Sequence, residues 1–576
     1  MHNTFLEEIG RLGGTEVFDA QAAARDFGAD TGASQIGFGG AIRVLDAAAI
    51  RLIVLAANRH RQALWPVSGG RNFGYGTARP AVEGTILLDL SALRAVTINV
   101  ENATAEIQPG VTQADLEQAI AASGADLLVP TTGVGPNGNL LGNALDGGYG
   151  LTPVADHFSA LAALDGFWGD GSPFRHVYAD MDCADMAERW SCGTGPAWGG
   201  LLRQGNLGIV TRATLQLARV PEAVRILVLE WPSSAAFQAD QAALSRLVEE
   251  IPGIGGVIAM NDYRILSTQA DAPLASEARG EARMAYLDGQ AQQRRIARWT
   301  AIATLYGSRA MVAGAARDIR RRLDGCRVWS FTPREVRWLD KLFGVLPQGF
   351  LPHIRRHLGS LVNALGTVQG RPIVAFLRIA YALEALPREL GLASDPARDG
   401  SGILWYAPLV PLNAASVARY ETVMSEVLQR HGFDPLLALT TRSSRVLSAT
   451  IPILFRRDDA IAAVRAKACY VDLVKAGLAQ GWPPYRIGSD TMHLVHPPVD
   501  SVTAQLHTRL KLALDPVQVI SPGRYTRHQD ADAALRALQL DGVTASRSAQ
   551  RQAVFAPVDS EFPPLDQTPD VDGRLN

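Results

Sequence analysis

The sequence of 576 residues contains little lysine and almost no net charge. Only four of its 55 basic residues are lysines, and the formal net charge is −2. This balance gives no sign of the strongly basic surface that a nucleic acid or an acidic membrane attracts. We therefore expect neither as a partner.

Long apolar runs are also missing. No stretch approaches the ~18 consecutive apolar residues that a membrane-spanning helix needs. The first ten residues, MHNTFLEEIG, carry acidic side chains where a secretory signal has basic ones. The sequence is thus expected to be that of a cytoplasmic protein.

Cysteine is scarce as well. Cys183, Cys192, Cys326 and Cys469 are scattered, and no CxxC pair or other metal-ligand spacing occurs. This excludes a disulfide framework and predicts that the protein has no metal site.

The local patterns present predict an α+β fold. Residues 45–64 favour a helix that ends near Arg59–Gln62, followed by a short strand in ALWPVS, and GTILLDLSAL reads as another strand. Apolar and polar residues then alternate on both sides of Glu101–Asn102, as in a hairpin. Thr112 has the position of a helix cap, with an acid three residues later. A Rossmann unit is disfavoured, because its glycine loop would open a helix directly.

The character of the sequence changes near Pro221. Residues 222–455 contain long helical stretches, SSAAFQADQAALSRLVEE and the segment from GEARMAYLDG to ARDIRRRL. Strand-like pieces are interleaved with them, namely VRILVLEW, RPIVAFLRIA, SGILWYAPLVP and SATIPILF. We expect a second α/β domain here, a linking helix over 456–479, and an irregular tail over 545–576.

Glycine gathers in three places. In WPVSGGRNFGYG, successive backbone N–H groups can converge on an anion, typically a pyrophosphate. Two further stretches between residues 125 and 215 place glycines beside apolar pairs such as Leu140–Leu141 and Ile209–Val210. Glycine beside buried apolar residues indicates close approach of the backbone to a ligand.

Five motifs occur in one order along the chain. They are GRNFGYG, LLGNALDGGYGLTPVADHF, GPAWGGLLRQGNLGIVT, the pair Tyr485–Arg486, and KLALDPVQVISPGRY. This set resembles the flavoprotein family of vanillyl-alcohol oxidase and p-cresol methylhydroxylase, which includes eugenol and alkylphenol hydroxylases. The resemblance implies a two-part FAD-binding domain of that type with an α/β substrate cap domain. The implied ranges are 1–221 for the FAD-binding domain, 222–479 for the cap, and 480–576 for the C-terminal return and tail.

The resemblance also implies which residues hold FAD. The loop after ALWPVS matches the family segment that cradles the FAD pyrophosphate, and the later glycine-rich segments match those that approach the flavin. The implied cofactor-binding residues are Ser68, Gly69, Gly70, Arg71, Asn72, Phe73, Gly74, Thr131, Thr132, Leu141, Gly142, Asn143, Gly148, Gly150, Leu151, Gly205, Asn206, Gly208, Ile209 and Val210.

Three residues match the family's catalytic positions, namely Tyr75, Tyr485 and Arg486. An arginine beside two tyrosine hydroxyls stabilises an oxyanion by charge-assisted hydrogen bonds. The resemblance implies that they bind a phenolate, whose para benzylic carbon then releases a hydride to flavin N5. It further implies oxygen or a c-type cytochrome as electron acceptor, and we expect a homodimer.

The sequence departs from the family pattern at three points. Leu151 replaces a phenol-binding tyrosine, and Thr131 or Thr132 replaces an aspartate near flavin N5, which removes a general base. Ile403 replaces the histidine or tyrosine that bonds the flavin, although Tyr406 is nearby, so we expect non-covalent FAD. The expected substrate pocket contains Leu151, Ile403 and Trp405. These departures leave two alternatives open: oxidation of a non-phenolic alcohol, amine or ring substrate, or a catalytically degenerate flavin-binding protein.

Overall fold

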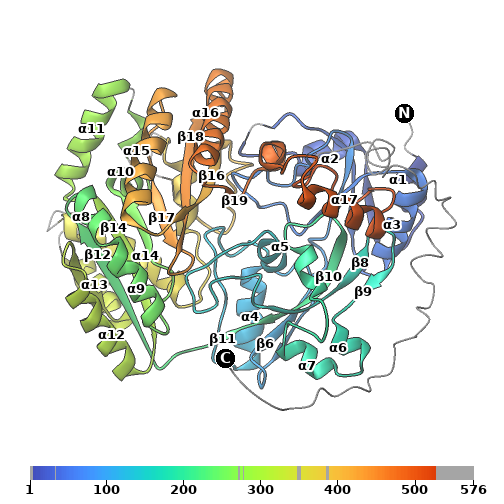
Figure 1. Cartoon of the computed structure of the whole chain (residues 1–576), viewed down its shortest axis with the longest axis horizontal. Helices are drawn as coiled ribbons and strands as arrows, with labels where there is room; N and C mark the ends of the chain where they lie inside the picture. The colour runs from blue at the N-terminus through green and yellow to red at the C-terminus, as the bar shows by residue number, and fades with distance from the viewer. Residues whose placement is uncertain are drawn as a thin grey trace, which may run out of the picture. The chain divides into compact units, whose positions relative to one another are not determined.

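The structure is a computed structural model of the chain. It describes residues 4–526, except residues 33, 270, 272, 277, 347–351 and 385–387. The predicted tail over 545–576 lies outside the described residues. The described residues belong to one compact unit that contains three main sheets (Figure 1). This mixture of helices with parallel and antiparallel strands confirms the α+β class.

The first sheet has four strands in the order β1-β2-β4-β3. Strands β2, β3 and β4 are parallel to one another, and β1 is antiparallel to β2. Helix α3, predicted within residues 45–64, packs the side chains of Ile50, Ile53 and Val54 into the same core as Ile86 and Leu88. The elements of this layer are α1 (Thr4–Ile9), β1 (Thr15–Phe18), α2 (Ala20–Phe27), β2 (Phe38–Val44), α3 (Ala49–His60), β3 (Leu64–Val67) and β4 (Thr85–Asp89).

The second sheet has five strands in the order β5-β6-β10-β8-β9, all antiparallel. The predicted hairpin is β5–β6, and the predicted cap is confirmed, because Thr112 and Asp115 form a reciprocal capping box. The elements of this layer are β5 (Val96–Asn99), β6 (Thr104–Ile107), α4 (Gln113–Ser123), β7 (Leu127–Leu128), α5 (Leu140–Leu145), β8 (Leu161–Trp168), β9 (Pro173–Phe174), α6 (Val177–Asp180), α7 (Ala184–Arg189), η1 (Trp198–Leu202), β10 (Gly208–Gln216) and β11 (Ala218–Arg219).

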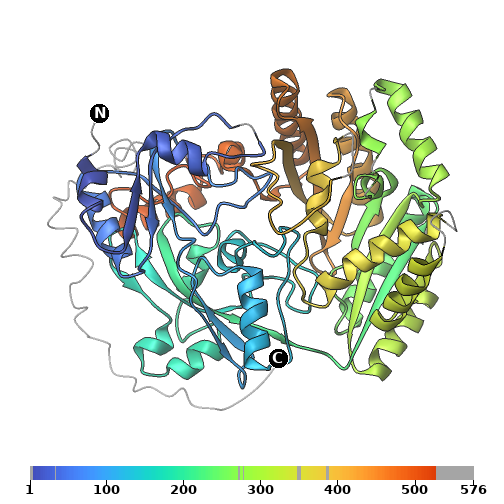
Figure 2. The ribbon, with the colours of Figure 1, turned by 180° about the vertical axis from the view of Figure 1, so that it is seen from behind.

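The third sheet has eight antiparallel strands in the order β15-β12-β14-β13-β17-β18-β16-β19 (Figure 2). Helix α16 packs on β16 and β18, and α12 packs on β12 and β14. Along the chain, the first strand of this sheet is β12 (Ala223–Trp231), which follows the domain boundary predicted near Pro221. The division into domains stays a prediction.

The remaining elements of this layer are helices, short 3₁₀ helices and strands. They are α8 (Ser234–Ala239), α9 (Gln241–Glu250), β13 (Ile258–Asn261), α10 (Asp262–Leu266), η2 (Pro273–Ala275), α11 (Gly280–Gln293), β14 (Trp299–Gly307), α12 (Arg309–Arg322), β15 (Arg327–Phe331), α13 (Pro333–Val345), α14 (Pro352–Val368), η3 (Ala375–Tyr381), β16 (Ser401–Pro411), α15 (Ala414–Arg430), β17 (Ala438–Thr441), β18 (Val446–Arg456), α16 (Ala460–Ala479) and β19 (Pro484–Arg486).

Two predicted elements in this region are wrong. The long helix predicted from Gly280 to Leu323 is interrupted by strand β14, whose β-branched and aromatic residues favour a pleated sheet. The strand predicted in RPIVAFLRIA is instead the short 3₁₀ helix η3. A short apolar run fits either conformation, because its periodicity alone does not separate them.

The C-terminal segment returns to the first sheet. Leu64 N donates to Val519 O at 2.7 Å, and Ser521 N donates to Leu64 O at 2.8 Å. The two views show the orange-red helices of this segment, α17 (Val502–Leu514) and η4 (Ser489–Val495), beside the blue N-terminal helices. None of the described helices is long and apolar enough to cross a membrane.

A buried ion pair fixes this return. Lys511 Nζ donates to Asp515 Oδ2 at 2.6 Å and to Ile520 O at 2.7 Å, and Asp515 also accepts from the Val519 and Ile520 amides. Asp515 is fully buried. Burial lowers the pKa of Lys511, while Asp515 acts in the opposite direction. Removal of the carboxylate therefore leaves a buried cation without its counter-ion.

We predict that Asp515→Ala destabilises the protein by about 3–5 kcal/mol, because it uncovers a buried charge. The control is Asp185→Ala, which removes the acid of the exposed i,i+4 pair with Arg189 and should leave the stability close to that of the wild type. Melting temperatures of the two variants check this. Equal, small shifts would contradict the role given to Asp515.

Candidate functional site

A cavity of about 450 Å³ opens where the three sheets meet. Its walls come from the loop after β3, the segments around α5, the start of β10, and the C-terminal return at Ser521 and Arg524. Helix η3 and strands β16 and β19 supply the opposite wall. The cavity is therefore formed by segments that lie far apart in the sequence, from the loop after β3 to Arg524.

The structure brings most of the residues singled out from the sequence to this cavity. Those that line it are Ser68, Gly69, Gly70, Arg71, Asn72, Phe73, Tyr75, Thr132, Leu141, Gly142, Asn143, Gly148, Gly205, Gly208, Ile209, Val210, Ile403, Trp405, Tyr485 and Arg486. Between Thr131 and Thr132, which the sequence left open, Thr132 is the one on the cavity. It accepts a hydrogen bond from Gln113 Nε2 at 3.0 Å.

Five predicted residues do not line the cavity: Gly74, Thr131, Gly150, Leu151 and Asn206. Thr131 turns away because its hydroxyl donates to Thr367 O at 2.9 Å. Leu151 packs into an apolar cluster, and its carbonyl accepts from Tyr306 at 3.1 Å.

The other three residues lie behind the cavity wall and pack against it. Asn206 Nδ2 donates to Thr526 Oγ1 at 3.2 Å. A Cβ on Gly150 would lie 2.6 Å from Thr131 O, so this glycine permits close backbone packing. Gly74 packs against Trp405, described below. These five positions support the cavity without facing it.

The glycine loop and α5 approach each other so closely that side chains are excluded. A Cβ on Gly69 would lie 2.2 Å from Asn139 Oδ1, and one on Gly142 would lie 2.6 Å from Ser68 Oγ. Gly70 adopts φ +62°, which favours glycine. The result is a cradle walled by main chain, which fits a dinucleotide cofactor whose phosphates bind backbone N–H groups.

Trp405 joins the glycine loop to β16. Its backbone N donates to Gly74 O at 3.1 Å, and a Cβ on Gly74 would lie 2.1 Å from Trp405 Cδ1. The next carbonyl, that of Tyr75, accepts from Ser489 N at 3.2 Å. The backbone of Tyr75 is thus fixed between β16 and η4.

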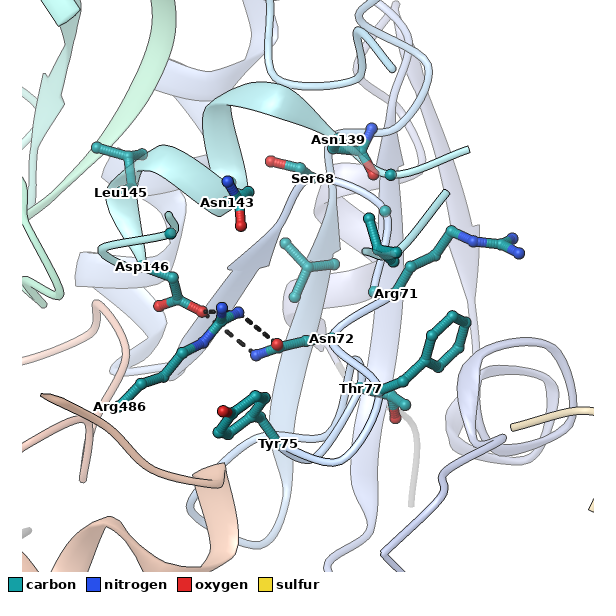
Figure 3. A pocket seen from close by; sticks show the side chains of 18 of the residues that line it. Ser68, Arg71, Asn72, Tyr75, Thr77, Asn139, Asn143, Leu145, Asp146 and Arg486 are labelled. Carbon is teal, nitrogen blue, oxygen red and sulfur yellow. Dashed lines mark hydrogen bonds and ion pairs between the residues drawn. The ribbon is translucent and has the colours of Figure 1, made fainter. Parts of the chain in front are cut away.

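Tyr75 and Arg486 meet in the cavity. The Arg486 Cζ lies 4.6 Å from the centre of the Tyr75 ring. Arg486 Nη2 donates to Asp146 Oδ2 at 3.0 Å and to Asn72 Oδ1, as the dashed lines in Figure 3 show. Arg71, in contrast, points away from this group and pairs with Asp395 at 3.4 Å.

Asp146 holds two arginines. Its carboxylate pairs with Arg486 on one side and with Arg524 on the other. Burial acts to raise the pKa of Asp146, but Arg524 and Arg486 outweigh it and lower the pKa below its usual value. Burial lowers the pKa of Arg486, but Asp146 and Tyr75 raise it overall. Asp146 and Arg486 are therefore both ionised, and with the second guanidinium of Arg524 the cluster carries one net positive charge.

The Tyr75 hydroxyl stays protonated at neutral pH. Burial raises its pKa well above the usual value, Tyr485 raises it further, and Arg486 opposes both. Tyr75 can therefore act as a hydrogen-bond donor to an oxyanion.

Tyr485 is positioned by residues that the sequence did not single out. The Arg442 guanidinium lies 4.3 Å from the Tyr485 ring centre and 4.2 Å from that of Tyr149, which also lines the cavity. Gln204 Nε2 donates to Tyr485 O at 2.8 Å. Tyr149 therefore lines the cavity, whereas Leu151, which we expected there from the sequence, does not.

Asp146 and Arg524 were also missed. Both fall inside the quoted motifs, in ALDGGYG and SPGRY, so their charged side chains beside the glycines were the available signal. Tyr406, considered for a flavin bond, faces away from the cavity, because Gly477 on α16 leaves room for its hydroxyl. Within the described ranges, no group of His, Cys, Asp and Glu could hold a metal ion.

The comparisons agree with this geometry. Residues 40–172 match the model of the FAD binding domain. The chain is 29% identical over 500 residues to 1'-carboxy-chondrochloren decarboxylase of Chondromyces crocatus, covering 84% of this chain and 90% of the relative. It is 23% identical over 483 residues to the flavoprotein subunit of hydroxylating 4-cresol dehydrogenase of Pseudomonas putida, covering 82% and 84%.

Two solved structures share the fold. p-Cresol methylhydroxylase with substrate bound has a TM-score of 0.77 at 20% identity, over 91% of this chain and 96% of that one. The isoeugenol complex of 4-ethylphenol oxidase from Gulosibacter chungangensis has a TM-score of 0.77 at 22% identity, over 91% and 95%.

The cradle and the matches define an FAD-binding flavoprotein. The chain is an FAD-dependent oxidoreductase with the fold of p-cresol methylhydroxylase and 4-ethylphenol oxidase, and its similarity to the 4-cresol dehydrogenase flavoprotein subunit agrees with the resemblance found in the motifs. The predicted fold class is likewise confirmed.

We predict that Gly74→Ala lowers the affinity for FAD by about 10- to 100-fold, because its Cβ displaces Trp405 from the wall. Gly84→Ala is the matched control. Gly84 has φ +74°, against +78° for Gly74, but a Cβ there would meet no atom within 4 Å. Fluorescence titration of the apoproteins with FAD distinguishes them. Equal FAD affinities of Gly74→Ala and Gly84→Ala would contradict the role given to the contact with Trp405, since both variants strain the backbone alike.

His157 provides a pH test of the cradle. It is buried, Asn143 Nδ2 lies 2.7 Å from its Nδ1, and burial lowers the pKa of His157 to about 4. The unfolded state therefore binds this proton first as pH falls, and stability is lost between about pH 6.5 and 4, by about 3 kcal/mol in total. We predict that His157→Gln flattens the fall of melting temperature over this range. An unchanged slope of melting temperature against pH in His157→Gln would contradict this role of His157.

Proposed function

We propose that this protein takes a hydride from a para-substituted phenol or a related aromatic alcohol. The observation that supports this most directly is the Arg486 guanidinium over the Tyr75 ring, with Tyr485 beside them on the same cavity wall. Two hydroxyls and a cation around one point suit an oxyanion.

FAD, when bound, supplies a flavin N5 that accepts a hydride. The residues that would hold it are the glycine loop over 68–73, Gly142 and Asn143 on α5, and the start of β10 at residues 208–210. Asn143 is held in place by His157. The backbone cradle described above suits the diphosphate, and the cavity beyond it is left for the substrate.

The protein's own groups favour the phenolate form of the substrate. Tyr75 donates a hydrogen bond to the phenolic oxygen, and the charge shared by Arg486, Arg524 and Asp146 lowers the free energy of the oxyanion. Ionisation of the phenol raises electron density at the para benzylic carbon, which makes loss of hydride easier. Arg486 acts through its fixed position, since Asn72 and Asp146 hold its guanidinium.

We further propose that FAD is held non-covalently. No histidine is among the described residues that line the cavity, the resemblance aligns the apolar Ile403 with the family's histidine or tyrosine link, and Tyr406 faces away from the cavity. Acid precipitation of the holoprotein tests this, since flavin colour that stays in the pellet would contradict it. Oxygen or a c-type cytochrome as acceptor, a homodimer and a cytoplasmic location stay predictions.

A second candidate is a reaction in which the substrate loses a carboxylate, since the name of the Chondromyces crocatus relative is that of a decarboxylase. Asp146 is the one acid among the described lining residues, and two arginines keep its pKa low. It therefore cannot activate water as a general base near neutral pH. Thr132 supplies no base either, which favours a product formed without attack by water.

We predict that Tyr75→Phe slows anaerobic flavin reduction by a para-alkylphenol about 100- to 1000-fold, because one oxyanion donor is lost. Tyr406→Phe is the control, since this hydroxyl is buried, has no hydrogen-bond partner among the described residues and does not reach the cavity. Stopped-flow bleaching of the flavin gives both rates. Failure of every para-substituted phenol to bleach the wild type, while a non-phenolic alcohol does so, would reject the proposal.

A further inference from the structure

The cavity is lined by more positive than negative charge. Among the described residues its charged side chains are Arg71, Arg79, Arg264, Arg486, Arg524 and Asp146. Most of the arginines have partners: Arg71 pairs with Asp395, and Asp146 serves Arg486 and Arg524. Arg79 donates to Ile36 O at 2.7 Å and to Gly28 O at 2.6 Å.

Arg264 differs from the others. Its Nε and Nη1 atoms are buried and have no hydrogen-bond partner among the described residues. Burial lowers the pKa of Arg264 to about 9, and Tyr420 is the group that acts against this shift. The guanidinium is thus charged at neutral pH and desolvated, without a carboxylate beside it. Arg264 lines the cavity and none of the described acids pairs with its guanidinium, and a charge on a cavity wall without a counter-ion favours the binding of an anion there.

The local structure holds Arg264 on the cavity wall. It lies in α10, where Asn261 caps its backbone N–H at 2.9 Å, and the neighbouring acid, Asp262, is engaged by Arg298. The Arg264 Cζ lies 5.2 Å from the ring centre of Trp405. Stacking on the indole fixes the guanidinium at the cavity wall, where its charge attracts an anion.

Apolar side chains line much of the cavity to which Arg264 belongs. Phe376, Leu377 and Ile379 of η3 and Ile403 of β16 line the same cavity. The substrate atoms on this side are therefore expected to be hydrocarbon that ends in one anionic group.

We infer that Arg264 binds a carboxylate at the end of the substrate's side chain. The single positive charge of a guanidinium matches a monoanion such as a carboxylate, whereas a phosphate dianion would keep one charge unmatched. The substrate class is then an aromatic compound with a carboxylated side chain. This inference rests on the proposed function, since it concerns the substrate of the same cavity.

Three ligands test the inference on the FAD-loaded protein: 3-(4-hydroxyphenyl)propanoate, neutral 4-propylphenol, and 3-phenylpropanoate, which lacks the hydroxyl. Perturbation of the flavin absorbance gives each Kd without turnover. The hydroxylated carboxylate should bind the wild type about 10- to 100-fold more tightly than 4-propylphenol. Arg264→Met should abolish this preference and leave the Kd of 4-propylphenol unchanged, and Arg264→Lys should restore part of it. Arg320→Met, an exposed arginine on α12, is the control.

The outcomes separate the two claims. Weaker binding of 3-phenylpropanoate to Arg264→Met supports the carboxylate site even if no phenol reduces the flavin, which would reject the phenol proposal alone. The inference is overturned if wild type shows no preference for carboxylates, or if Arg264→Met keeps it. It is also overturned if that variant loses FAD instead, because Arg264 would then serve the cofactor. If Arg264→Met does not fold, the wild type and Arg264→Lys test the inference. The wild type should bind 3-(4-hydroxyphenyl)propanoate more tightly than 4-propylphenol, and Arg264→Lys should keep part of this preference.

Discussion

The cavity depends on one buried ion cluster, in which Asp146 holds Arg486 and Arg524. Asp146 follows α5 directly, Arg486 ends β19, and Arg524 lies on the C-terminal return. A charge in a low-dielectric interior is stable only with its partners in place, so the cluster forms only when all three segments are docked. It thereby fixes the position of Arg486 over Tyr75.

The cluster also sets the electrostatics of the site. Two arginines and one aspartate leave a net positive charge, which favours an oxyanion near Tyr75. The same pairing removes Asp146 as a proton acceptor. Among the described lining residues, the cavity therefore combines strong support for a bound anion with no acid that could activate water, and Arg264 adds a further cation that has no carboxylate partner there.

Local signals in the sequence predicted much of the fold. The capping residues of α4, the β5–β6 hairpin and the glycine loop follow from neighbouring residues alone, and the motif set was specific enough to place Tyr75 and Arg486 on one site. Strand β14 was missed because helix-forming residues flank it on both sides. Leu151 and Thr131 were misplaced because a motif gives register but not the direction of each side chain.

The most direct measurement is a crystal structure of the FAD-loaded protein with 4-propylphenol. We expect the phenolic oxygen within hydrogen-bond distance of the Tyr75 and Tyr485 hydroxyls and of Arg486, with the alkyl chain directed towards the part of the cavity wall that contains Arg264. A phenolic oxygen turned towards that wall, away from Tyr75 and Arg486, would contradict it.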